Sequence, residues 1–130
     1  MKKVNSIMLI DDDKVTNFYH KIVIQGVNCC ERIDVFDDAT EALHHLKDTS
    51  ELPDIIFLDI NMPRMNGWEF IETIMEDGLD KKILNACIIV MLTTSLNPND
   101  KEKALQYKVI SDFKHKPLTK EILKEVIISL

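Results

Sequence analysis

Short apolar runs alternate with amphipathic stretches along the whole chain, and this alternation restricts the possible folds more than any other feature. Strand-like apolar runs lie at residues 7–10, 55–58 and 87–92, and weaker ones lie at residues 33–35 and 109–113. Between these runs, and after the last of them, apolar residues recur with helical spacing. Strands that alternate with helices form parallel sheets through crossover connections. The sequence therefore predicts an α/β fold with five parallel strands and five helices.

The five predicted strands are of two kinds, and the difference predicts their order in the sheet. The first, third and fourth are continuous apolar runs, which are typical of strands covered by helices on both faces. The second and fifth are interrupted by Asp34, Ser111 and Asp112, which indicates edge positions. Two edges around a centre of strands one, three and four give the order 2-1-3-4-5. This is the order of a flavodoxin-like, doubly wound sheet.

Spacing and capping residues predict where the helices lie. Asn97 and Pro98 suit the start of the helix after the fourth strand, and Thr119 suits the cap of the last helix. Gly26 is predicted to end the first helix, whose spacing is set by Val15, Phe18, Tyr19, Ile22 and Val23. Residues 78–85, from Gly78 to Asn85, are expected to form a loop before the fourth strand.

The composition indicates one domain and argues against several classes of function. A chain of 130 residues and 15.0 kDa fits a single domain that buries its own core. The net charge of -6 argues against nonspecific binding to nucleic acid or to an anionic membrane. The N-terminus does not resemble a signal peptide, and no apolar run is long enough to span a bilayer. The three cysteines are odd in number and lack metal-binding spacing, which favours a reducing, cytoplasmic location.

Four charged residues are predicted to meet at one edge of this sheet. Asp11 and Asp12 follow the first strand, Asp59 follows the third, and Lys116 follows the fifth. Ligands of open α/β sheets bind outside the carboxyl ends of the strands, at the switch point between strands one and three. Three carboxylates at that point repel one another unless a cation joins them. Mg²⁺, which prefers oxygen ligands, and the Lys116 ammonium would balance the charge, so the sequence predicts a site that handles a phosphoryl group.

Two further residues fit such a site, although each has a simpler explanation when it is taken alone. The backbone carbonyl of Asn61, in the loop after Asp59, can turn toward the same ion. The Thr93 hydroxyl follows the fourth strand, where it can donate to an anion held at Asp59. A strand-end hydroxyl is common, and Asp13 needs only to cap the first helix. Compatible chemistry at four separate strand ends makes the combination specific.

The chain resembles the receiver domain of two-component response regulators, in order and at comparable spacing over nearly its whole length. The resemblance is carried by Asp11-Asp12, the stretch Asp59-x-x-Met62-Pro63-x-x-x-Gly67, Thr93 and Lys116-Pro117. It implies one receiver domain over residues 1–130, similar to the stand-alone chemotaxis regulators. Because the chain ends soon after Thr119, we expect no output domain.

The resemblance assigns a role to each acidic residue. Asp59 would accept a phosphoryl group from the phosphohistidine of a sensor histidine kinase or a phosphotransfer protein. Asp12, Asp59 and the Asn61 carbonyl would bind Mg²⁺, and Asp11 would hold its water ligands. No enzymatic activity is expected beyond the domain's own phosphorylation and dephosphorylation.

The resemblance also implies how the signal leaves the site. Lys116 would pair with Asp59 and then with the phosphoryl oxygens, Thr93 would bond the phosphoryl group, and Phe113 would be the aromatic switch. A downstream protein would bind the face made by the helix after the fourth strand, the fifth strand and the last helix. Three features depart from the family pattern: Thr94 replaces a smaller residue, Phe113 lacks the frequent tyrosine hydroxyl, and residues 78–85 are longer than usual.

Two other classes of function remain open at the level of sequence. Asp11-x-Asp13-x-Val15-Thr16 matches the opening motif of haloacid-dehalogenase-type phosphatases, in which Asp11 would be the nucleophile. The chain is short for that fold, lacks a late acidic pair and leaves Asp59 without a role. A receiver-like binding module that never takes phosphate is the third reading, and the complete acidic site argues against it.

Overall fold

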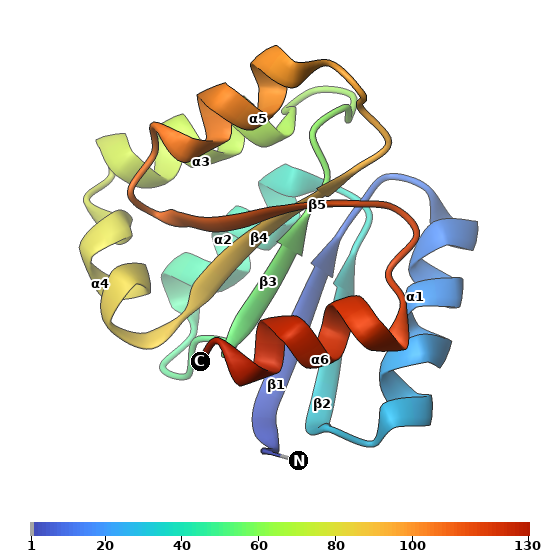
Figure 1. The fold of residues 1–130 in the computed structure, drawn as a ribbon. Coiled ribbons are helices and arrows are strands. Elements are labelled where there is room, and N and C mark those ends of the chain that lie inside the picture. Colours follow the sequence, from blue (N-terminus) through green and yellow to red (C-terminus); the bar gives the residue numbers. More distant parts are fainter. Residues whose placement is uncertain (1) are drawn as a thin grey trace.

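The computed structural model describes residues 2–130 and contains one parallel sheet of five strands (Figure 1). Along the chain the strands are β1 (Val4–Ile10), β2 (Cys30–Phe36), β3 (Ile55–Leu58), β4 (Ile88–Thr93) and β5 (Ile110–His115). Their order in the sheet is β2-β1-β3-β4-β5, so the predicted order and both predicted edges are confirmed. The predicted strand limits differ by a few residues; for example, Cys87 precedes β4 instead of starting it.

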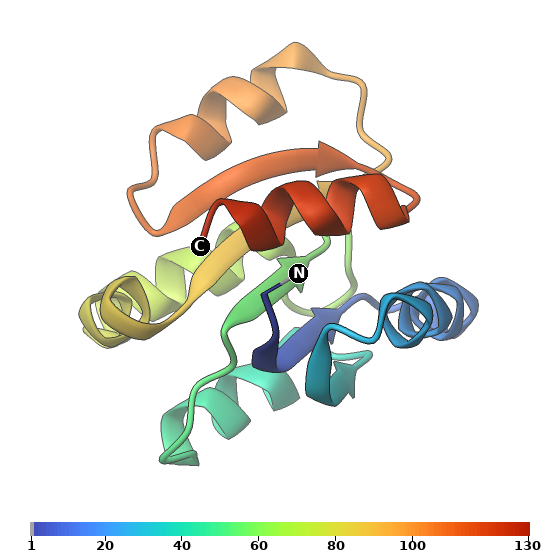
Figure 2. The ribbon, with the colours of Figure 1, turned by 60° about the horizontal axis from the view of Figure 1, so that its bottom comes forward.

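The sheet is covered on both faces, as Figures 1 and 2 show from two directions. The helices are α1 (Lys14–Val27), α2 (Ala39–Asp48), α3 (Gly67–Glu76), α4 (Leu79–Ala86), α5 (Pro98–Leu105) and α6 (Lys120–Ile128). One core cluster lies under α1 and α6, and the other lies under α2, α3, α4 and α5. Among the described residues, none of the helices has the length and apolarity needed to cross a membrane.

The continuous apolar strands follow from this double covering. In β1, Ile7 and Leu9 belong to the cluster under α1 and α6, whereas Met8 and Ile10 belong to the opposite cluster. Successive side chains of a strand point to opposite faces, so a strand covered on both faces is apolar along its covered length, as β1 is from Ile7 to Ile10. β3 and β4 divide their side chains between the two clusters in the same way.

The number of helices corrects the sequence prediction, because residues 78–85 are largely helical and not a loop. Gly78 adopts a left-handed conformation with φ of 74°, which separates α4 from α3. Ile83 then points into the core and is fully buried. A helix of this length is not stable alone in water, so its packing on α3 and the core is what stabilises it.

Helix α1 is confirmed, but it continues past Gly26, which was predicted to end it. Asn28 caps it in a left-handed conformation, and the Asn28 N–H donates to the carbonyls of Gln25 and Ile24. The inward face is formed by Asn17, His20 and Ile24. The apolar residues that set the helical spacing lie mostly in solvent, with exposed fractions of 77% for Val15, 67% for Phe18, and 48% each for Tyr19 and Ile22.

Candidate functional site

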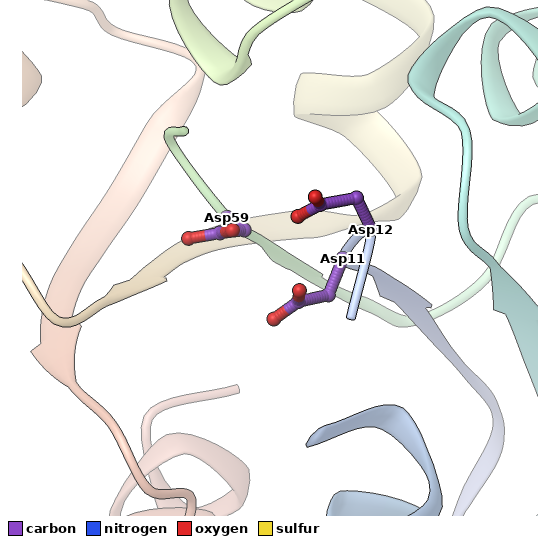
Figure 3. Close-up of side chains that lie close together, drawn as sticks. All are labelled: Asp11, Asp12 and Asp59. Carbon is purple, nitrogen blue, oxygen red and sulfur yellow. The ribbon is translucent and has the colours of Figure 1, made fainter. Parts of the chain in front are cut away.

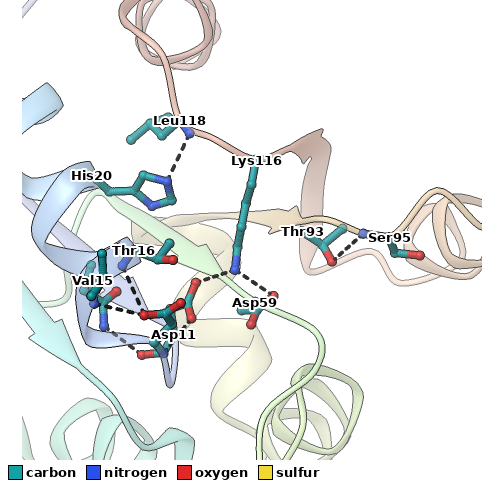
Figure 4. Close-up of polar contacts among 11 residues, drawn as sticks. Asp11, Val15, Thr16, His20, Asp59, Thr93, Ser95, Lys116 and Leu118 are labelled. Atoms are coloured by element: carbon teal, nitrogen blue, oxygen red, sulfur yellow. Dashed lines mark hydrogen bonds and ion pairs between the residues drawn. The ribbon is translucent and has the colours of Figure 1, made fainter.

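Four of the predicted site residues lie together at the carboxyl edge of the sheet: Asp11, Asp59, Thr93 and Lys116 (Figure 4). Backbone hydrogen bonds extend the sheet one residue past each strand: Asp11 N–H donates to the Phe36 carbonyl at 3.1 Å, and Asp59 N–H donates to the Ile10 carbonyl at 3.0 Å. At the ends of β4 and β5, Lys116 N–H donates in the same way to the Thr93 carbonyl at 2.9 Å. The backbone that carries each functional side chain is therefore held by the sheet itself.

Asp11, Asp12 and Asp59 form a cluster of carboxylates (Figure 3). One oxygen from each of the three side chains lies within 4.8 Å of the others. Asp11 and Asp59 are buried, with exposed fractions of 5% and 7%, whereas Asp12 is exposed. Three hard oxygen donors at this spacing, one of them open to solvent, suit a small divalent cation.

Lys116 supplies positive charge to the buried pair (Figure 4). Its Nζ lies 2.5 Å from Asp11 Oδ2 and 3.3 Å from Asp59 Oδ1, and its side chain is 13% exposed. The structure thus brings Lys116 to Asp59, as predicted, but places it closer to Asp11. The two carboxylates share one ammonium, so negative charge remains in excess at the site.

The pKa values reflect this excess. Burial, and then the neighbouring Asp11 carboxylate, raise the pKa of Asp59 to about 6, although Lys116 opposes both effects. Burial alone would lower the pKa of Lys116, but hydrogen bonding and charge from Asp11 outweigh it and raise that pKa. Lys116 therefore stays protonated. The charged form of Asp59 is disfavoured by its surroundings, so added positive charge at the site would stabilise it.

Asp13 has a different role from its two neighbours. Its Oδ1 accepts hydrogen bonds from the N–H groups of Val15 at 2.9 Å and Thr16 at 3.4 Å, so it is the predicted cap of α1. These hydrogen bonds, that of Thr16 first, lower the pKa of Asp13. Asp13 N–H in turn donates to Asp11 Oδ1 at 3.0 Å. Capping therefore uses one carboxylate and leaves Asp11 and Asp12 at the site.

The loop after Asp59 is shaped by Gly67, the first residue of α3. A Cβ at this position would lie 2.4 Å from the backbone oxygen of Asp59, so any side chain would push the loop away from the site. Asn66 caps α3 in a capping box with Glu69. Within the loop Asn61, two residues after Asp59, is exposed.

The two predicted switch residues, Thr93 and Phe113, are both buried. Thr93 is fully buried, and its Oγ1 accepts a hydrogen bond from Ser95 N–H at 3.2 Å. Phe113 is 6% exposed and makes an edge contact with His115, with ring centroids 5.7 Å apart. Thr94, a departure from the family pattern, is exposed. The Lys116-Pro117 bond is cis, an arrangement that X-Pro bonds allow.

Sequence reasoning missed two buried polar residues of α1 that lie behind the site, Asn17 and His20. Asn17 Nδ2 donates to the Asp11 carbonyl at 2.7 Å, and His20 Nε2 accepts from Leu118 N–H at 3.1 Å. They were detectable in principle, because they share a helix face with Ile24 opposite the apolar stripe. That face points inward, with Ile24 in the apolar core and Asn17 and His20 beside the site.

The fold and the site define a class of signalling domain, and comparison with known proteins identifies it. The model of the response regulator receiver domain family matches residues 7–128, so the chain belongs to this family. In two-component signalling, such domains are phosphorylated on an aspartate. The predicted fold class, family and signalling function are therefore confirmed.

Individual relatives agree with this assignment. A two-component response regulator from Cytophaga hutchinsonii has a solved structure with 31% identity and a TM-score of 0.86, covering 99% of this chain and 100% of that one. A CheY-like receiver domain from Methanospirillum hungatei has 26% identity and a TM-score of 0.75, covering 96% of this chain and 93% of that one. Hybrid signal transduction histidine kinase D of Dictyostelium discoideum is 31% identical over 101 residues, which is 77% of this chain and 6% of the kinase. The chain spans 6–49% of the length of the curated relatives it matches here.

Proposed function

We propose that Asp59 is the aspartate that takes the phosphoryl group and that Lys116 and Thr93 assist the transfer. The observation that supports this most strongly is the meeting of three carboxylates and the Lys116 ammonium at one edge of the sheet. Asp59 follows a buried strand and is itself held by a backbone bond to Ile10, so its carboxylate has little freedom to move. Phosphoryl transfer depends mainly on such positioning and on charge neutralisation.

The carboxylate cluster fits Mg²⁺, the ion that this chemistry requires. Asp12 and Asp59 would hold it together with the backbone carbonyl of Asn61, and Asp11 would hold its water ligands. Mg²⁺, when bound, supplies positive charge beside the transferring phosphoryl oxygens. The raised pKa of Asp59, caused by burial and Asp11, indicates that the metal-free site lacks that charge.

The chain's own residues account for the rest of the transfer. An oxygen of the Asp59 carboxylate forms a bond to phosphorus while the bond from phosphorus to the donor's histidine nitrogen breaks. The Lys116 ammonium, already 3.3 Å from Asp59, then pairs with a phosphoryl oxygen, and the Thr93 hydroxyl donates to another. Water later cleaves the acyl phosphate, which restores the Asp59 carboxylate and releases phosphate. On this proposal the domain acts only on itself.

The phosphodonor would be a sensor histidine kinase or a phosphotransfer protein, and the output would go to a protein partner in the cytoplasm. A phosphoryl group at Asp59 draws the Thr93 hydroxyl toward it and changes the space beside β4. Phe113, buried on the neighbouring strand β5, is the side chain that responds to this change. We place the partner surface on α5, β5 and α6.

Mass spectrometry with a small phosphodonor, with and without Mg²⁺, tests the acceptor assignment. The wild-type protein and an Asp11→Asn variant should form an acyl phosphate on Asp59, and Asp59→Asn should form none. Modification of Asp11 would favour the phosphatase alternative, and stoichiometric modification of Asp59→Asn at another residue would refute the assignment. Lack of any Mg²⁺-dependent modification would favour the binding-module alternative.

The output proposal has a separate test, which uses the phosphoryl analogue beryllium trifluoride. Partner affinity, or self-association where no partner is in hand, should change with the analogue in the wild-type protein. Phe113→Ala should still bind the analogue but should lose that change. If Phe113→Ala responds as strongly as the wild-type protein, Phe113 is not the switch.

A further inference from the structure

Helix α1 presents polar side chains to the interior where a surface helix ordinarily presents apolar ones. Asn17 and His20 are 3% and 2% exposed, whereas Val15 and Phe18 on the same helix lie largely in solvent. Burying an amide and an imidazole costs free energy unless they are hydrogen-bonded. The bonds that these two residues make therefore indicate what the inward face of α1 does.

Both bonds go to the backbone of segments that carry the Asp11–Lys116 ion pair. Asn17 Nδ2 holds the carbonyl of Asp11 itself, at 2.7 Å. His20 Nε2 accepts the N–H of Leu118, two residues beyond Lys116, at 3.1 Å (Figure 4). One helix thus holds both members of a pair whose charged atoms are 2.5 Å apart.

The bond to Leu118 matters because of what lies around it. Lys116 N–H is held on the preceding side by the Thr93 carbonyl, and Pro117 has no N–H to contribute. His20 therefore holds the backbone that follows Lys116, just as Thr93 holds the backbone at Lys116 itself. Leu118 is itself fully buried, so its N–H would be left without a partner if the imidazole acceptor were removed.

We propose that His20 is a positioning residue for phosphoryl transfer: through the Leu118 N–H it holds the Lys116 ammonium at the distance from Asp59 that the transfer needs. This inference rests on the proposed function, because it assumes that Lys116 assists transfer to Asp59. His20 does not touch the reacting atoms and acts only through Lys116.

The chemistry of the ring agrees with this role. An imidazole that accepts at Nε2 carries its proton on Nδ1 and is neutral. Burial, the largest effect on the ring, lowers the pKa of His20, which keeps it neutral at neutral pH. A cavity of about 10 Å³ lies between Asn17, His20, Asp11 and Asp59. This cavity is no larger than one water molecule requires, so α1 packs closely against the site.

Replacements of His20 that differ only in where they place an acceptor test the proposal. His20→Gln keeps an acceptor at the position of Nε2, whereas His20→Asn places it at the position of Nδ1, too short to reach Leu118. The initial rate of phosphoryl uptake from acetyl phosphate at saturating Mg²⁺ is measured on folded protein, alongside thermal unfolding. Ile24→Val, a core change on the same helix away from the site, is the control for lost stability.

We expect His20→Asn to slow uptake about tenfold, which is less than the roughly hundredfold loss that a misplacement of about 1 Å can cause. His20→Gln should stay within about twofold of the wild-type rate. Ile24→Val should leave the rate unchanged, although it should lose about as much stability as His20→Asn. In a Lys116→Met background, His20→Asn should cause little further loss, because its effect passes through Lys116.

The outcomes separate this inference from the function on which it rests. Equal rates for His20→Asn and the wild-type protein, or an equal slowing with and without Lys116, would overturn the positioning role. Slowing of His20→Gln to the level of His20→Asn would overturn the hydrogen bond as its basis. If the wild-type protein took no phosphoryl group on Asp59, the proposed function itself would fail.

Discussion

Replacing Asp59 by asparagine should stabilise the metal-free protein, because the native carboxylate is charged in a site that disfavours its charge. Burial and the Asp11 carboxylate raise the pKa of Asp59 to about 6, against an ordinary value of 3.8. A difference of about 2 pKa units corresponds to about 3 kcal/mol at neutral pH, at about 1.4 kcal/mol per unit. Asparagine resembles the neutral carboxyl group, so Asp59→Asn should gain up to about this amount, or roughly 10 °C in Tm.

The sign of the pH dependence provides an internal check. Between about pH 6 and pH 4, the folded wild-type protein takes up a proton at Asp59 that the unfolded chain does not yet bind. The wild-type protein therefore gains stability at this position as the pH falls through that window, and the advantage of Asp59→Asn shrinks. Below about pH 4 both states of the wild-type protein are protonated there, so the advantage should be lost.

Urea unfolding in the presence of a chelator measures the effect, with the buried Trp68 as a fluorescent reporter. Glu102→Gln, which removes one negative charge at an exposed position of α5, is the control and should change stability by less than about 0.5 kcal/mol. The reasoning is refuted if Asp59→Asn is no more stable than the wild-type protein at pH 7. It is also refuted if the difference persists unchanged down to pH 4.

Four further substitutions and the addition of Mg²⁺ test other parts of the site and its supports. Gly67→Ala should destabilise the protein by about 1–3 kcal/mol, because its Cβ would meet a backbone oxygen at 2.4 Å. Gly26→Ala, with nothing within 4 Å, should instead stabilise α1 by about 0.5–1 kcal/mol, and urea unfolding of both variants checks the opposite signs. Mg²⁺ at a hundred times its Kd should stabilise the wild-type protein by about 2.7 kcal/mol, and Asp12→Ala should lose most of that gain in a melting assay. Asn66→Ala should cost about 1 kcal/mol by removing the cap of α3, and an unchanged urea midpoint would contradict this.

The sheet could be predicted because its central strands contain continuous apolar runs and its edge strands do not. Asp34, Ser111 and Asp112 marked the two edge strands, and the order of the sheet followed from those interruptions. The strand ends then brought Asp11, Asp59 and Lys116 together without any knowledge of side-chain contacts. Topology alone thus accounted for most of the site.

The features that the sequence did not predict lie where one pattern fits two arrangements. In α1, helical spacing shows that Val15 and Phe18 share a face, but it does not say whether that face points inward. The inward face is the polar one, because Asn17 and His20 hold segments of the site. Helix α4 was missed because its first helical residues follow a glycine, and only the buried position of Ile83 shows that the turn packs on the core.

The order of the strands has a consequence for how the protein folds. Asp11, Asp59 and Lys116 come from three strands that are far apart in the sequence, so their charges meet only when those strands have paired. Parallel pairings between distant segments form slowly, because each requires the closure of a long loop. The repulsion between Asp11 and Asp59 therefore arises once β1 and β3 have paired, whereas Lys116 can relieve it only after β4 and β5 have joined the sheet. An intermediate that has paired β1 with β3 but not yet β4 with β5 would thus carry the carboxylate repulsion without its lysine partner.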